Sequence, residues 1–197
     1  MKKSLGAKVV AMPSPVWIVG TYGDHGRPNI MTVAWGGICC SVPPCIAIAV
    51  QQSRLTHSNI TKRKAFTVNV PSRHHLAAAD YAGIASGKYT DKFAVAGLTP
   101  VRSELVDAPY IGEFLLVLEC KLLHTVALGG HTQFIGQILD AKADAAVLRD
   151  NENPAMASVS PLISSAADRK YYALGECLGQ TYHIGLQLVD QEEGKNV

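Results

Sequence analysis

Two segments in the first third of the chain combine residue types that can hold a flat, anionic ligand. The first, residues 29–37, ends in a tryptophan and two glycines after a β-branched, apolar stretch. Glycine lets a ligand approach the backbone closely because it has no side chain. The second, residues 51–59, places an arginine among hydroxyl side chains. A cation and hydroxyls at a helix N-terminus are groups that bind phosphate.

A flavin nucleotide is one ligand that would use both segments, because its ring needs backbone groups and an apolar wall while its phosphate needs donors and cations. Lys88 and Lys92 add two cations four residues apart, which a helix would place on one face. Each feature alone also has a plain structural explanation. Trp35 could be a core residue, residues 53–59 a capped helix, and the two lysines solvated side chains.

Sequence patterns for other chemistries are weak or missing. The chain has no HExxH, GxSxG or GxGxxG motif, and His74 and His75 are adjacent rather than one helical turn apart. We therefore expect no metal site and assign no catalytic residue.

The cysteines and two aromatic residues leave open questions. Cys39 and Cys40 could be redox-active beside a ligand-binding strand, but small buried hydrophobic residues explain them better. Tyr171 either closes over a ligand ring or lies in a strand packed on the body of the protein. His131 has no assigned role.

Short β-strands separated by turn residues must position these side chains. The patterns predict strands over residues 16–21, 30–34, 45–51, 66–70, 114–123 and 132–139. Fewer helices are expected, over residues 53–64 with Ser53 as cap, 72–82 with Ser72 as cap, and 88–96. This mainly β order, with helices inserted in the loops, favours an antiparallel Greek-key barrel over a doubly wound sheet.

Composition limits the kind of protein this is. The 197 residues are 48% hydrophobic and 17% charged, which suits one globular domain over residues 1–197, and we expect a flexible tail at 191–197. With 18 basic against 16 acidic residues, we expect no nucleic-acid partner. The longest apolar run, residues 114–118, is far short of the roughly 20 residues that span a bilayer, so we expect no membrane association. The five cysteines, without paired motifs, suggest a reduced cytoplasmic protein.

In their order and spacing, several fragments together resemble the flavin reductase-like family of FMN-binding split barrels, and its flavoredoxin branch in particular. The resemblance covers most of the chain. The matching fragments are residues 16–21, 26–35, 41–44, 53–60, 66–71, 86–87 and 91–93.

The resemblance implies a mainly β Greek-key split barrel with FMN as cofactor. It places the flavin ring beside the strand of residues 29–35 and the phosphate among residues that follow the next strands. The implied cofactor-binding residues are Asn29, Met31, Thr32, Val33 and Trp35 near the ring, and Ser53, Arg54, Thr56 and Lys92 around the phosphate. It also implies a homodimer with FMN near the subunit interface.

The implied function is oxidoreduction through the bound flavin, of the NAD(P)H:flavin reductase or flavoredoxin type. NAD(P)H or a redox protein would supply the electrons. Because there is no GxGxxG fingerprint, a nicotinamide would have to stack on the flavin rather than occupy a domain of its own. Two alternatives stay open: an electron carrier that serves a partner protein without small-molecule turnover, and a non-redox FMN-binding barrel.

Overall fold

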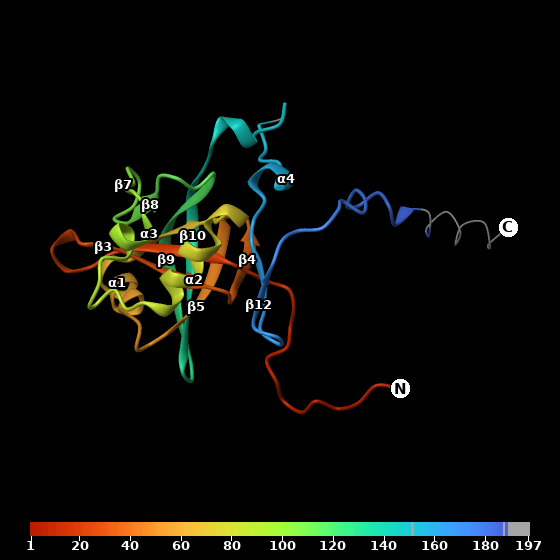
Figure 1. Ribbon diagram of the computed structural model, residues 1–197, viewed down its shortest axis with the longest axis horizontal. Helices are drawn as coiled ribbons and strands as arrows, with labels where there is room; N and C mark the ends of the chain where they lie inside the picture. The colour runs from red at the N-terminus through yellow and green to blue at the C-terminus, as the bar shows by residue number, and fades with distance from the viewer. Residues whose placement is uncertain (151, 187, 189–197) are drawn as a thin grey trace.

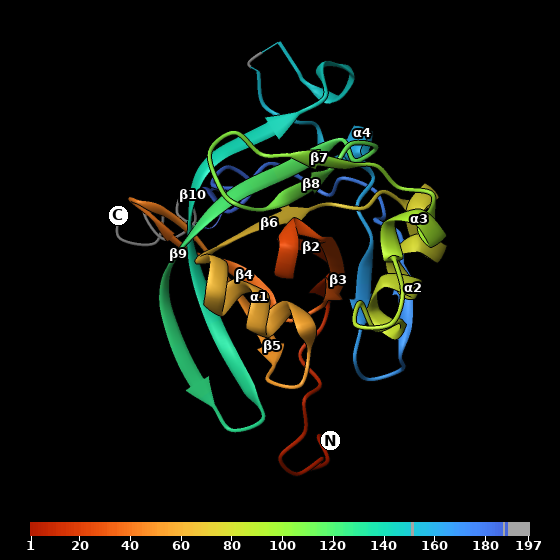
Figure 2. The same ribbon diagram turned by 90° about the vertical axis from the view of Figure 1, so that its left-hand side faces the viewer.

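The structure is a computed structural model that describes residues 1–150, 152–186 and 188 (Figure 1). Its centre is a seven-stranded sheet in which every neighbouring pair is antiparallel, in the order β3-β2-β6-β9-β10-β5-β4. The strands are β2 (Trp17–Tyr22), β3 (Pro28–Val33), β4 (Gly36–Ser41), β5 (Pro44–Gln51), β6 (Ala65–Asn69), β9 (Leu116–Leu128) and β10 (His131–Ala143). Figure 2 shows this sheet curled rather than flat.

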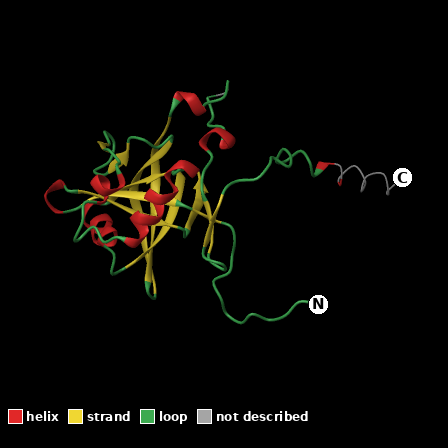
Figure 3. Cartoon of the chain, viewed as in Figure 1, coloured by secondary structure: helices red, strands yellow, loops and turns green. Residues whose placement is uncertain are grey.

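Of the remaining elements, one short strand precedes these strands in the chain, several elements lie in the connections between them, and the last few follow β10 (Figure 3). The helices are α1 (Leu55–Arg63), α2 (Leu76–Ile84), α3 (Lys92–Ala96) and α4 (Met156–Val159), with short 3₁₀ turns η1 (Asp24–Gly26), η2 (Arg73–His75) and η3 (Ala145–Val147). Strands β1 (Ser14–Pro15), β11 (Ile163–Ser165) and β12 (Lys170–Tyr172) form a second sheet, and β7 (Pro100–Arg102) pairs with β8 (Pro109–Ile111). The prediction of a mainly β fold with helices in the loops is confirmed.

The core has two parts because β2 is buried on both faces. Val19 packs with Ile48, Phe66 and other residues inside the curled sheet, whereas Ile18 packs in a second cluster that includes residues of α2 and α3. Alternate side chains of a strand point to opposite faces, so one strand serves both clusters. The two layers fix α2 and α3 against β2 and β3.

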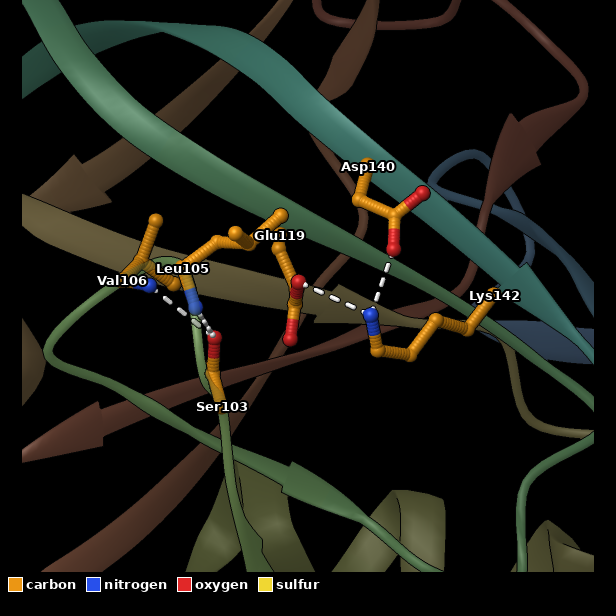
Figure 4. Close-up of polar contacts among 6 residues, drawn as sticks. All are labelled: Ser103, Leu105, Val106, Glu119, Asp140 and Lys142. Carbon is orange, nitrogen blue, oxygen red and sulfur yellow. Dashed lines mark hydrogen bonds and ion pairs between the residues drawn. The ribbon is translucent and has the colours of Figure 1, made fainter.

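Figure 4 shows a polar group buried in this sheet. Glu119 on β9 is fully buried and accepts a hydrogen bond from Lys142 Nζ at 3.1 Å, and the same ammonium also contacts Asp140. Nearby, the buried Ser103 hydroxyl accepts bonds from two backbone N–H groups of the following turn. Buried charges are kept when they are paired, so we regard this cluster as structural.

Several predicted boundaries differ from the structure. Strand β3 ends at Val33, so Trp35 lies in the link to β4 and not in the strand. Helix α1 begins at Leu55 with Arg54 as the N-cap, and Ser53 makes no capping hydrogen bond. The Ser72 hydroxyl bonds the ring of His75 instead of capping a helix through the backbone.

Two further expectations are corrected on the β4 and α3 side. Helix α3 begins only at Lys92 and is capped by Asp91, so Lys88 lies in the preceding turn and the two lysines do not share a helix face. Cys39 and Cys40 are exposed on β4, an edge strand, and are not buried hydrophobic residues. The predicted tail at residues 191–197 lies outside the described residues. Among the residues described, no helix is long and apolar enough to cross a membrane.

Candidate functional site

A two-part cleft lies between β3, β5 and the start of α1. One compartment has a volume of about 220 Å³ and the other about 390 Å³, and they share Met31, Gln51 and Arg54 in their walls. Shared walls make them neighbouring parts of one cleft. Their combined size falls within the range of roughly 300–1,000 Å³ that is usual for sites that bind small molecules and cofactors. We call them the ring compartment and the phosphate compartment.

The ring compartment is bordered by the backbone of β3. Consecutive residues from Met31 to Ala34 all line it, and since side chains of a strand alternate between faces, some of these contacts must come from backbone atoms. The Thr32 hydroxyl itself donates to the carbonyl of Ala79 on α2 and so ties α2 to this strand. A flat ring placed here would meet backbone N–H and C=O groups along one edge.

The aromatic wall of this compartment comes from Trp35. Its ring lies 4.8 Å, centroid to centroid, from the ring of His131, with 37° between the planes. His131 is the first residue of β10 and lies directly opposite Gln51 of β5. This strand pairing brings His131 to the ring compartment, where it meets Trp35 although the two residues are far apart in sequence. Trp17, in contrast, packs against the core inside the sheet. Trp35 is 41% exposed and thus has free surface for a ligand.

The phosphate compartment gathers cations from three segments. Arg54 precedes α1, Lys88 lies in the turn after α2, and Lys92 opens α3. Ser53 and Thr56 add hydroxyls beside them. The N-terminus of α1 faces this space with no side chain hydrogen-bonded as its cap, and such a helix end carries partial positive charge.

Lys92 is a buried cation beside another cation. Its side chain is 4% exposed, and Nζ donates to the carbonyl of Ala82 at 2.7 Å. Burial, and next the charge of Arg54, lower the pKa of Lys92 to about 8. Two cations held close together with one of them desolvated are stabilised by an anion between them. The reading of Lys92 as a solvated side chain is therefore wrong.

Asn29 presents an unused acceptor to the same compartment. It is 5% exposed, and its amide donates to the Thr56 hydroxyl at 3.0 Å, while its Oδ1 has no hydrogen-bond partner among the described residues. Gly87 leaves the space for it, because a Cβ at position 87 would come within 1.9 Å of that Oδ1. Buried acceptors are normally paired, so Oδ1 is suited to a ligand donor.

The structure brings the residues expected from the sequence together as two groups. Met31, Thr32, Val33 and Trp35 line the ring compartment, and Asn29, Ser53, Arg54, Thr56 and Lys92 line the phosphate compartment together with Met31. The expected residues did not include Gln51, Gly83, Gly87, Tyr89 and His131, which also line the cleft. Gly87 lay in a matching fragment, and only the β5–β10 pairing reveals His131.

A third pocket, of about 290 Å³, adjoins the ring compartment and shares Thr32, Ala34 and Trp35 with it. Its outer wall is the β11–β12 hairpin, where Tyr171 donates a hydrogen bond to Asp80 at 2.9 Å. Burial and the Asp80 carboxylate raise the pKa of Tyr171 to about 12. Tyr171 belongs to a strand packed on the body of the protein, which was one of the two expectations for it.

Comparison with known proteins gives one domain match and several close relatives. A family model described as "Flavin reductase like domain" matches residues 9–172. The solved structure of the flavoredoxin of Desulfovibrio vulgaris (Miyazaki F) is 51% identical, with a TM-score of 0.90 over 94% of this chain and 100% of that chain.

The curated relatives match over shorter lengths. An uncharacterised protein of Archaeoglobus fulgidus is 37% identical over 57% of this chain and 64% of its own. A high molecular weight rubredoxin of Moorella thermoacetica is 37% identical over 51% of this chain and 44% of its own. The chain thus spans about two thirds or less of these two relatives.

Proposed function

Because the chain belongs to the flavin reductase-like domain family, we propose that it binds FMN in the two-part cleft and transfers electrons through the bound flavin. A flavin cofactor follows from the family, and its identity as FMN is the proposal. The observation that carries it is Lys92, a desolvated cation beside Arg54 at an uncapped helix N-terminus. A terminal phosphate, with nearly two negative charges, suits this group of cations better than the singly charged phosphates of a dinucleotide linkage.

In this proposal the protein residues bind and orient the cofactor and do not react. The bound flavin supplies the redox chemistry. Arg54, Lys92 and the hydroxyls of Ser53 and Thr56 hold the phosphate, and the Oδ1 of Asn29 accepts a hydrogen bond from the ligand. Thr56 is positioned for this because its hydroxyl accepts from Asn29 and keeps its own proton to donate.

The ring lies along β3 with Trp35 on its border. Backbone groups from Met31 to Val33 fix its edge, and the tilted Trp35–His131 pair excludes water from one side. Aromatic contacts with a flat ring contribute about 0.5–1.5 kcal/mol beyond the area they bury.

An electron donor would approach through the third pocket, which shares three wall residues with the ring compartment. NAD(P)H or a redox protein are the donors we propose. A redox protein has support in the relatedness to a high molecular weight rubredoxin. A reductase role has support in the relatedness to the reductase component of a 4-nitrophenol monooxygenase of Rhodococcus opacus, which is 26% identical over 62% of this chain.

One experiment separates these possibilities. The absorbance spectrum of the purified full-length chain, loaded with FMN, is recorded anaerobically before and after addition of NADH or NADPH. Rapid bleaching supports a reductase, whereas bleaching only by a reduced redox protein supports a carrier. A protein that remains colourless after incubation with FMN would refute flavin binding and favour a structural barrel.

We also propose that the protein is a homodimer. An apolar pocket of about 390 Å³ runs over Trp17, Ile38 and Met156, and Ile38 is 67% exposed. Residues 173–186 leave the body of the protein in Figure 1, with Leu178, Tyr182 and Ile184 exposed. Apolar surface of this kind on two separate segments fits contact with a second copy of the chain.

A further inference from the structure

Three of the five cysteines lie on one hairpin, formed by β4 and β5, outside the cleft residues to which a flavin role is assigned. Cys39 and Cys40 are exposed on β4, and Cys45 is buried on β5 with 4% exposure. The expected flavin chemistry uses none of these thiols. Their arrangement on the two strands therefore needs its own account.

The strand register places Cys40 directly opposite Cys45. The pair lies next to Ser41 and Pro44, which close the hairpin. Residues directly opposite in an antiparallel pair share a face, and their Cα atoms are about 4.5–5.5 Å apart. That separation lies within the range of about 4.4–6.8 Å found between the Cα atoms of disulfides.

Cys39 offers a contrast within the same strand. The register shifts between Ile38 and Cys40, and Cys39 falls at this irregularity without a partner of its own on β5. At a bulge two residues of one strand lie opposite one residue of the other, so Cys39 is also near Cys45. The register pairs Cys40, rather than Cys39, with Cys45 and so makes Cys40 the first partner to test.

The two thiols also differ in access. Cys40 is exposed, and its Sγ lies 3.3 Å from the carbonyl oxygen of Val42 at the surface turn. Burial raises the pKa of Cys45, and the nearby Cys40 and Cys39 raise it further. In a two-cysteine exchange site, the exposed thiol reacts first with the disulfide of the partner molecule. The buried thiol then attacks the mixed disulfide that has formed and releases the partner.

We propose that Cys40 and Cys45 form a dithiol–disulfide couple that exchanges with low-molecular-weight disulfides. The Cys40 thiolate attacks the small disulfide, a Cys40–sulfur bond forms, and the first small thiolate leaves and takes up a proton. The Cys45 thiolate, after giving its proton to water, then attacks Sγ of Cys40 and displaces the second small thiolate. Two protein thiols are oxidised to one disulfide, and one small disulfide is reduced to two thiols.

A disulfide between Cys40 and Cys45 would link the edge strand β4 to β5, close to the aromatic wall of the ring compartment. Strand β4 starts directly after Trp35, and Gly36 packs so tightly that a Cβ there would come within 2.7 Å of Trp17 and of the Ala47 carbonyl. Cys39, Trp35 and Ala49 line one shallow pocket, and the last two also line the ring compartment. The proposal does not depend on flavin binding.

The test treats the full-length chain carrying Cys177→Ser with oxidised glutathione, then alkylates free thiols and measures the intact mass. Cys177 is replaced because it is a further exposed thiol. We expect two fewer alkylated thiols than in the untreated chain, with no glutathione retained on Cys40 or Cys45; a sample taken before alkylation should show the loss of two hydrogens that a disulfide requires. Adding Cys39→Ser should leave this result unchanged.

Two further variants, each lacking one of the two thiols, test which thiol reacts first. Cys45→Ser should trap glutathione stably on Cys40, and Cys40→Ser should prevent loss of the Cys45 thiol. Thermal melting of each variant confirms that it is folded before treatment. A disulfide that disappears with Cys39→Ser, an intermolecular disulfide, or an unreactive Cys40 in the folded protein would each overturn the proposal.

Discussion

Lys92 is the residue whose surroundings say most about the ligand. Because Lys92 is buried and next to Arg54, its pKa is about 8, and its side chain loses its proton only slightly above neutral pH. Bound phosphate would favour the charged ammonium and raise this pKa again. Ligand binding and protonation of Lys92 are therefore coupled.

This coupling predicts a pH dependence of FMN affinity. Free protein loses the Lys92 proton as the pH rises through about 8, so the FMN dissociation constant should increase above that pH. One coupled proton gives at most about a tenfold change per pH unit. Fluorescence titrations from about pH 7 to about pH 9 measure it, with riboflavin as the control that shares the ring but lacks the phosphate. An equally flat profile for FMN and riboflavin would contradict the coupling.

Gly87 supports a second prediction at this scale. In Gly87→Ala the new Cβ would lie 1.9 Å from Oδ1 of Asn29, so Asn29 must move and its contact with Thr56 is strained. Overpacking of this kind costs about 1–3 kcal/mol, and we expect at least a several-fold loss of FMN affinity. The matched control is Gly130→Ala, where a Cβ meets nothing within 4 Å. If Gly87→Ala and Gly130→Ala bind FMN with equal affinity, Asn29 does not contribute to FMN binding.

At the scale of elements, the end of β3 decides where the aromatic wall lies. Trp35 leaves the strand and turns against His131, whereas Trp17 remains within β2 and packs on the core. These are the two tryptophans of the chain, so their emission can be separated by single substitutions.

We expect most of the FMN-dependent quenching of tryptophan emission to disappear in Trp35→Phe and to persist in Trp17→Phe. The reason is distance, since Trp35 lines the ring compartment and Trp17 does not. Titration of both variants with FMN measures the effect. Quenching that is lost in Trp17→Phe instead would place the ring elsewhere.

Much of this element level could be predicted from the sequence. Turn residues and β-branched runs located β2, β3, β5 and β6 within one or two residues, because local alternation and turn chemistry determine them. The end of β3 and the N-cap of α1 were each predicted one residue away from their positions in the structure, a difference that local patterns do not resolve. His131 needed the long-range pairing of β10 with β5, which no local pattern contains.

The same contrast holds for burial. Cys39 and Cys40 look like small core residues, but β4 is an edge strand and leaves them exposed. Lys92 looks like a surface residue, but α3 packs against β3 and buries it. In both cases contacts between distant segments decide the burial: the sheet order leaves Cys39 and Cys40 at an edge, and the packing of α3 on β3 covers Lys92.

For the whole molecule, the exposed apolar pocket predicts a homodimer. Ile38→Asp places a charge on this surface and should shift the protein from dimer to monomer, because an unpaired charge in a dry interface is costly. Val95→Asp is the control, since Val95 is 62% exposed on α3 and does not line that pocket. Light scattering at micromolar concentration reports the mass. A monomeric unmodified chain would reject the dimer.

The most direct test of the account compares FMN with riboflavin on the full-length chain and on the double variant Arg54→Ala, Lys92→Met. Charge-assisted hydrogen bonds contribute about 1.5–3 kcal/mol each, and about 1.4 kcal/mol corresponds to a tenfold change in affinity. We expect the unmodified chain to bind FMN at least tenfold more tightly than riboflavin and the double variant to bind both alike. Equal affinity for the two ligands in the unmodified chain would contradict phosphate recognition by this cleft.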